Sequence, residues 1–169
     1  MYWRRKVIIL GIDPGYGTIG YGVIEKLNGK IRAIDYGVIS TPKDKPISER
    51  LEMIYDAMNL IIDKFKPDEI ALEELFFNTN ITTGIKVAQA RGVLVLSAIK
   101  SCAKLYEYTP LQVKMALTGE GRAEKRQVQY MVKMLLKLTT IPKPDDAADA
   151  LAVAVCHAHT VGFNKRSLN

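Results

Sequence analysis

The sequence contains few of the residues that define several common classes of small protein. Its two cysteines, Cys102 and Cys156, are too few for a disulfide framework or a cysteine-based zinc site, so we expect free thiols in a reducing cytosol. No apolar segment approaches the roughly 20 residues of a membrane span, which predicts a cytoplasmic protein without a membrane anchor. The basic start and the apolar run after it resemble a signal peptide, but Asp13-Pro14-Gly15 interrupts the run early and no cleavage site follows. Repeats and low-complexity tracts are absent too, and the length predicts a single domain over residues 1–169.

The sequence does have an excess of positive charge, and one part of the chain carries it. Residues 100–143 hold nine Lys and Arg against three acids, an excess that equals the net charge of +6 for the whole protein. A local positive surface attracts phosphate backbones through counterion release. Solvated lysines on long helices would give the same composition, so charge alone does not separate the two interpretations. Arg122 in this span is a candidate DNA contact.

The pattern of apolar residues predicts an α/β fold with a mixed five-stranded central sheet flanked by helices. Three strands come first, and Asn28-Gly29 between the second and third is a strong hairpin signal. Helices and strands then alternate, which favours a sheet covered on both faces. The expected strands are residues 6–13, 17–25, 30–40, 69–74 and 106–109; the expected helices are 48–65, 82–105, a short one after Pro110, 123–138 and 145–159.

Four carboxylates stand at the ends of these elements: Asp13, Glu73, Asp146 and Asp149. Asp13 and Glu73 each follow an apolar strand, and Asp146 and Asp149 are three residues apart near the start of the last helix, so they share a helix face. Three or four carboxylates brought to one edge form an oxygen-rich site for hard divalent cations. Together with the basic span, they predict metal-assisted cleavage of nucleic acid.

Taken singly, each acid also has an ordinary structural explanation. Asp13 before Pro-Gly suits a turn, Glu73 suits a solvated strand end, and Asp146 suits a helix N-terminus. Asp149 fits such an explanation least, because it lies deeper in the helix among alanines. The two histidines, His157 and His159, cannot share a helix face, and core or solvated positions suit them better than a place at the metal site.

Six sequence blocks, in order, resemble the RuvC family of Holliday junction resolvases over nearly the whole chain. They are residues 8–15 with 20–24, 71–76, 89–93, 112–114, 123–125 and 146–152. The resemblance implies an RNase H-like fold, in agreement with the order of strands and helices. It implies that Asp13, Glu73, Asp146 and Asp149 are the catalytic, metal-binding acids. It also implies that Phe76 stacks on an unpaired base and that Lys114 and Lys125 engage phosphate near the scissile bond.

The same resemblance implies a structure-specific endodeoxyribonuclease that resolves four-way DNA junctions in recombination and repair. Two Mg²⁺ ions, roughly 4 Å apart, would bridge the scissile phosphate, with Mn²⁺ able to substitute, and the nicks would be symmetric and leave 5′-phosphate ends. We expect a homodimer that matches the symmetry of the junction, with the second long helix as candidate interface. A branch-migration helicase complex is the partner that the family implies.

Three other interpretations fit parts of the sequence. Gly11-Ile12-Asp13-Pro14-Gly15 loosely fits the first phosphate loop of actin-like and sugar-kinase phosphotransferases, but the chain is too short for their second half. A different RNase H-like nuclease would act on RNA–DNA hybrids or on another branched DNA. An inert DNA-binding module would not need a complete set of acids.

Overall fold

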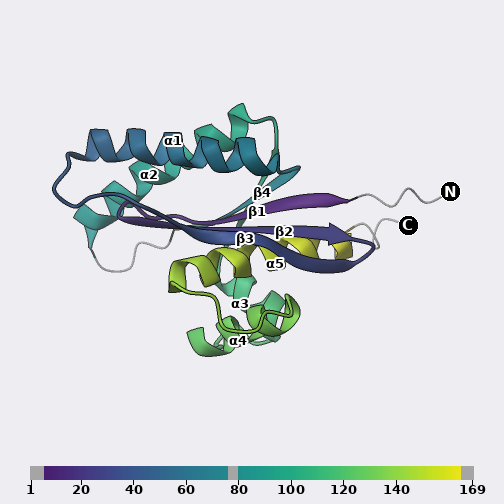
Figure 1. The fold of residues 1–169 in the computed structure, drawn as a ribbon. Helices are drawn as coiled ribbons and strands as arrows, with labels where there is room; N and C mark the ends of the chain where they lie inside the picture. The colour runs from purple at the N-terminus through teal and green to yellow at the C-terminus, as the bar shows by residue number, and fades with distance from the viewer. Residues whose placement is uncertain (1–5, 76–79, 165–169) are drawn as a thin grey trace.

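A five-stranded mixed sheet forms the centre of the molecule in the computed structural model, which describes residues 6–75 and 80–164 (Figure 1). Its strands follow the order β3-β2-β1-β4-β5 across the sheet. Strands β1, β2 and β3 are antiparallel neighbours, whereas β4 lies parallel to both β1 and β5. The strands are β1 (Val7–Asp13), β2 (Thr18–Leu27), β3 (Lys30–Ser40), β4 (Glu69–Glu73) and β5 (Lys104–Tyr108).

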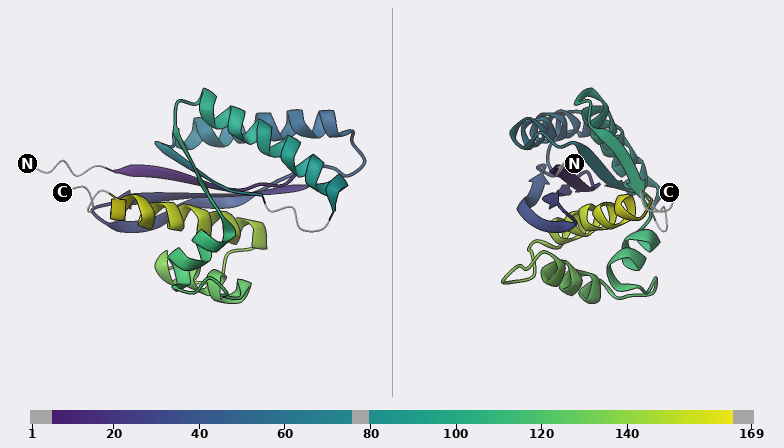
Figure 2. Two further views of the ribbon diagram at one scale, coloured as in Figure 1. Left: turned by 180° about the vertical axis from the view of Figure 1, so that it is seen from behind. Right: turned by 90° about the vertical axis from the view of Figure 1, so that its right-hand side faces the viewer.

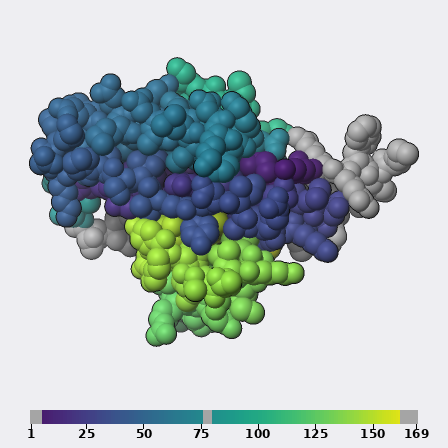
Figure 3. Space-filling model, in the orientation of Figure 1, coloured from purple at the N-terminus to yellow at the C-terminus, as the bar shows by residue number. Residues whose placement is uncertain are grey.

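Helices cover both faces of this sheet, as the sequence predicts. Helices α1 and α2 lie on one face, α5 lies on the other, and α3 and α4 pack against the outer side of α5 (Figure 2). The space-filling view shows the green α4 region as a lobe projecting below the sheet (Figure 3). The helices are α1 (Ile47–Phe65), α2 (Ile81–Lys100), α3 (Pro110–Thr118), α4 (Lys125–Leu135) and α5 (Asp145–Asn164).

The predicted fold class and the order of elements are confirmed, and the hairpin turn is where it was expected. Asn28 and Gly29 both have positive φ, 53° and 78°, as a two-residue type I′ turn requires. The turn sets the antiparallel register of β2 and β3, which pairs Leu27 with Lys30.

The second long helix was predicted too long. It ends at Lys100 rather than residue 105, and β5 begins at Lys104 rather than residue 106. Cys102, with φ of 62°, turns the chain between the two elements. Ala103 and Leu105 are two residues apart, as apolar residues on one face of a strand are, but they also continue the helical spacing of α2. The apolar pattern alone therefore could not locate the end of α2 or the start of β5. Helix α4 is also shorter than predicted, and α5 is longer.

Two hydrophobic cores lie on opposite faces of the sheet. In β1 and β4, Leu10 and Ile70 face the core under α1 and α2, whereas Ile9 and Ala71 face α5. Successive strand residues point to opposite faces, so a strand that is buried on both sides must be apolar throughout. Strand β1 is the central strand and β4 is its interior neighbour, and their carboxyl ends lie side by side at one end of the sheet.

Candidate active site

Asp13 and Glu73 end these two adjacent parallel strands. The register pairs Ile12 with Leu72, so the next residue along each strand brings the two acids together, and their side chains share a hydrogen bond. Burial raises the pKa of Asp13 to about 8, with further contributions from the negative charges of Glu73, Asp149 and Asp146. Burial also raises the pKa of Glu73, and its hydrogen bond to Asp13 opposes that shift. Without a cation, Asp13 therefore keeps its proton to a higher pH than an ordinary carboxyl group and donates it in the hydrogen bond to Glu73.

Helix α5 brings Asp146 and Asp149 to the same edge because glycines let it approach the sheet closely. An added Cβ at Gly20 of β2 would overlap the carbonyl oxygen of Asp146, and one at Gly11 of β1 would overlap that of Ala150. The backbone of α5 therefore rests directly on β1 and β2. Burial raises the pKa of Asp149, although the ammonium of Lys125 opposes that shift.

Two lysines from α3 and α4 lie beside these acids. Lys125 donates to Asp149 over 2.8 Å and lies 3.7 Å from Asp145. Lys114 and Lys125 both line a cavity of about 250 Å³ whose walls include Glu73 and Asp149. The charges of both lysines lower the pKa of Glu73, against the larger effect of its burial. The cavity thus places cationic groups and carboxylates around one space.

The helices that carry these lysines begin at well-defined caps. The side chain of Thr109 accepts from the backbone N–H of Gln112, and the Gln112 side chain accepts in return from the Thr109 N–H. Glu124 and Gln127 form the same reciprocal arrangement at the start of α4. Such capping boxes fix the first turn of a helix. Lys125 is the first residue of α4 and lies in such a capped turn, whereas Lys114 lies one turn after the cap of α3.

A buried arginine that the sequence analysis missed supports the loop after Asp13. Arg50 of α1 donates to the Thr41 hydroxyl over 2.9 Å and to the Tyr16 carbonyl over 3.3 Å. Its guanidinium also lies over the Tyr16 ring, 4.6 Å from the centroid. Nothing in the spacing of Arg50 distinguishes it from the exposed charges of α1. The contact of the loop with α1 revealed its role.

The acid set fits a hard divalent cation. Within residues 6–75 and 80–164, no three acidic, histidine or cysteine side chains are drawn together closely enough to form a complete cation cage. The acidic neighbours of Asp13 are nevertheless Glu73, Asp146 and Asp149, whose carboxylate oxygens are ligands that Mg²⁺ prefers. Burial, followed by the negative charges of Glu73, Asp149 and Asp146, raises the pKa of Asp13, so the ionised carboxylate is unfavourable in this site without a counter-charge. A bound cation would supply that counter-charge.

The other candidate residues lie in different surroundings. Phe76 lies outside the described residues, and Arg122 is exposed in the turn between α3 and α4. Asp145 contacts Lys143 at 3.2 Å, which lowers the pKa of this carboxyl. His157 is fully buried and His159 is exposed, as the sequence favoured. Both cysteines are free thiols.

The described helices include none that is both long and apolar enough to cross a bilayer.

Comparison with known proteins assigns a family. Residues 9–157 match the family described as "Crossover junction endodeoxyribonuclease RuvC". A protein of that name from Alkaliphilus oremlandii is 54% identical over 94% of this chain and 97% of its own length, and one from Clostridioides difficile is 53% identical over 96% of each. Among solved structures, Thermus thermophilus RuvC in complex with Holliday junction substrate superposes with a TM-score of 0.88 at 35% identity, over 94% of this chain and 96% of that one.

Proposed function

The chain belongs to the RuvC family of crossover junction endodeoxyribonucleases, and from that premise we propose that it resolves four-way DNA junctions by hydrolysing phosphodiester bonds. The observation that carries the proposal is the convergence of Asp13, Glu73 and Asp149 beside a cavity lined by Lys114 and Lys125. These groups come from β1, β4, α5, α3 and α4. Acids for a cation and lysines for a phosphate are the two components that nuclease chemistry needs.

Divalent metal dependence follows from the family, and we infer that two Mg²⁺ ions are held by Asp13, Glu73, Asp146 and Asp149, with Mn²⁺ able to replace them. When bound, such ions activate water and stabilise the leaving oxygen. Asp13 is the candidate for the ligand shared by both ions, because it ends the central strand and lies beside each of the other three acids. Its strand is paired on both sides, and the pairing with β2 reaches Asp13 itself, opposite Gly20.

Lys114 and Lys125 serve the phosphate in this proposal. Each lines the cavity, where an ammonium neutralises charge that builds up on phosphoryl oxygens. Lys125 also neutralises Asp149 in the cation-free site. Lys125 contacts Asp149 and also lines the cavity. Its ammonium can therefore neutralise the carboxylate before DNA binds and the phosphate afterwards.

Recognition of the junction involves groups farther from the acids. Phe76 comes three residues after Glu73, the last residue of β4, and we propose that its ring stacks on an unpaired base near the crossover. Such stacking contributes about 1–3 kcal/mol per base. Arg122 is exposed in the turn before α4 and suits contact with the DNA backbone. Both roles remain predictions.

We propose that the active form is a homodimer formed through α2. An apolar stripe, defined as Ile85, Gly92, Leu96 and Ile99, runs along its exposed face. The three large side chains are 56%, 52% and 58% exposed, and a Cβ at Gly92 would meet nothing within 4 Å. Apolar residues spaced along a whole helix in this way suit close packing against a second helix. Two copies would then present two sites to the two strands of one junction.

A cleavage assay tests the proposed function. A synthetic four-way junction, an RNA–DNA hybrid and a linear duplex are each incubated with the protein and Mg²⁺, and the nick positions are mapped. We expect paired, symmetric nicks with 5′-phosphate ends on the junction alone. Preferential cutting of the hybrid would assign the chain to another RNase H-like activity. Calorimetry with ATP, for which we expect no binding, tests the phosphotransferase alternative.

The cellular setting follows from the substrate. Four-way junctions arise in DNA recombination and repair, so we propose a cytoplasmic location beside the chromosome and cooperation with a branch-migration helicase complex. Co-purification of the protein with junction DNA and such a helicase would test the assembly.

A further inference from the structure

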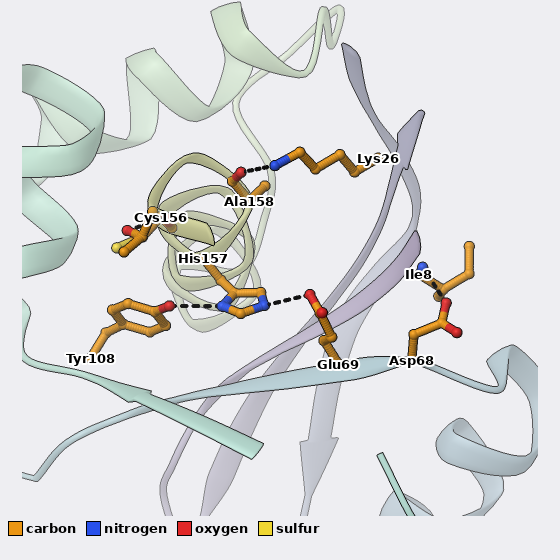
Figure 4. A network of polar contacts seen from close by, with 9 residues as sticks. Ile8, Lys26, Asp68, Glu69, Tyr108, Cys156, His157 and Ala158 are labelled. Carbon is orange, nitrogen blue, oxygen red and sulfur yellow. Dashed lines mark hydrogen bonds and ion pairs between the residues drawn. The ribbon is translucent and has the colours of Figure 1, made fainter. Parts of the chain in front are cut away.

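A buried polar chain links α5 to β4 and β5 away from the acids. His157 of α5 is fully buried, and its two ring nitrogens contact different strands (Figure 4). Nδ1 lies 2.7 Å from the hydroxyl of Tyr108, and Nε2 lies 2.8 Å from a carboxylate oxygen of Glu69. The Tyr106 ring packs against the imidazole, 4.4 Å between centroids. Glu69, Tyr106 and Tyr108 of the sheet therefore all contact His157 of α5.

The direction of each hydrogen bond follows from the chemistry of the groups. Burial lowers the pKa of His157, so the imidazole is neutral and has one donor and one acceptor. The Glu69 carboxylate only accepts, hence Nε2–H donates to it and Nδ1 accepts from the Tyr108 hydroxyl. Burial raises the pKa of Tyr108 to about 12, so this donor keeps its proton. In these two hydrogen bonds each group thus has one role, and the Tyr108 hydroxyl is also hydrogen-bonded to the Thr160 side chain.

The positions of these residues relate them to the acids. Glu69 and Glu73 are four residues apart on β4, so they share the face toward α5 and are separated by roughly 13 Å. Asp149 and His157 are eight residues apart on α5, roughly 12 Å along the axis. Tyr108 is also the partner of Glu73 in the register of β4 and β5. The stretch from Glu69 to Glu73 on β4 and the stretch from Asp149 to His157 on α5 are therefore similar in length. Glu73 and Asp149 lie at one end of these stretches, and the His157–Glu69 hydrogen bond lies at the other.

The acids cannot hold α5 in place by themselves. The negative charge of Asp149 raises the pKa of both Asp13 and Glu73, so this acid of α5 repels the two acids of the sheet. Small changes in the depth or rotation of α5 would move Asp149 relative to Glu73. We propose that Tyr108, His157 and Glu69 form a positioning network that fixes α5 against β4 and thereby sets the spacing of Asp149 from Glu73. The proposal rests on the proposed function, because it assigns these residues to the nuclease site.

Three substitutions separate positioning from simple stability. Tyr108→Phe removes one hydroxyl, and Glu69→Leu removes the acceptor for Nε2–H. Glu69→Gln keeps an acceptor oxygen and serves as the conservative rescue. Ile54→Val, in the core on the opposite face of the sheet, is the control for a general loss of stability, since it lowers Tm by a few degrees without touching the network.

Each variant is measured at 25 °C, below its unfolding transition. The readouts are the single-turnover cleavage rate on saturating junction, the dissociation constant for the junction without metal, and the midpoint of a direct Mn²⁺ titration. We expect Tyr108→Phe and Glu69→Leu to lower the rate roughly ten-fold and to raise the Mn²⁺ midpoint several-fold. Junction affinity should stay within about two-fold, because among the described DNA-binding candidates none of Lys114, Lys125 and Arg122 is hydrogen-bonded to the network. Glu69→Gln and Ile54→Val should remain close to the wild type.

Two results would overturn the proposal. One is a lower Tm for Tyr108→Phe and Glu69→Leu with wild-type rate and wild-type Mn²⁺ midpoint, which would make the network purely structural. The other is equal damage from Glu69→Gln and Glu69→Leu, which would mean that the hydrogen bond is not what matters. If the wild type fails to cut junctions, the proposed function fails, while the Mn²⁺ titration still reports on the network.

Discussion

Replacing Asp13 with Asn should stabilise the cation-free protein while it abolishes cleavage. The pKa of Asp13 is about 8 in the folded protein, against 3.8 in a model peptide. Between these values the folded state binds more protons than the unfolded chain, so wild-type stability falls as the pH rises from about 4 to 8. The amide of the Asp13→Asn variant does not titrate, so it adds no pH dependence to the stability, and it can still donate a hydrogen bond to Glu73. The advantage of the variant should therefore grow with pH.

The size of the effect follows from the shift. One pKa unit corresponds to about 1.4 kcal/mol, which sets a ceiling of about 5 kcal/mol for the gain at pH 8. Because Glu73 shares the proton and the neighbouring cavity admits water, we expect a smaller gain of about 2 kcal/mol, falling below about 1 kcal/mol at pH 5. The pH dependence of the gain is thus the diagnostic quantity.

Urea unfolding followed by circular dichroism at pH 5, 6.5 and 8, in a metal chelator, measures the gain. Asp56→Asn, on the exposed side of α1, is the matched control and should change stability at no pH. Saturating Mg²⁺ should reduce the difference in unfolding free energy between Asp13→Asn and the wild type, because a cation neutralises the acids of the wild type. The variant should still bind junctions, since the lysines remain. A variant that is less stable than the wild type at pH 8, or equally changed at all three pH values, would refute the reasoning.

Other predictions address the remaining parts of the site. Lys125→Ala should slow cleavage and reduce by about one the slope of log K for junction binding against log salt; an unchanged slope would mean that the side chain does not contact phosphate. Gly20→Ala should cost more than about 2 kcal/mol in urea unfolding and should lower activity, because the added methyl group displaces α5 at Asp146; wild-type behaviour would show that the helix can move away freely. Leu96→Glu should shift the protein to a monomer by light scattering, whereas Leu60→Glu on α1, where Leu60 is 71% exposed, should not; a dimer in both would place the interface elsewhere.

The fold could be predicted from the sequence because the residue patterns that determine its strands and its hairpin are local. Asn28-Gly29 set the hairpin, and continuous apolar runs marked the two buried strands. Boundaries were predicted less well where apolar residues suited both periods, as at Leu105. There the helix ends at the turn at Cys102, which has a positive φ, and the residue type gives no indication of such a turn.

For the candidate site, the proximity of Asp13 and Glu73 could be predicted from the sequence, whereas the residues that pack around the site could not. Asp13 and Glu73 followed obvious strands, so their proximity came from the sheet order. Arg50 and His157 were not distinguishable in the sequence from an exposed charge and an ordinary core residue. Their partners, Tyr16 and Glu69, are 34 and 88 residues away in the chain. Contacts over such separations follow from tertiary packing rather than from sequence spacing.

The late position of α5 in the chain has a consequence for protein synthesis. Every strand of the sheet leaves the ribosome before Asp146 and Asp149 do. Until α5 is made, the nascent chain lacks half of the acid set and the cover of one face of its sheet. A nuclease built in this order stays harmless to the chromosome until translation has passed its last helix and that helix has docked.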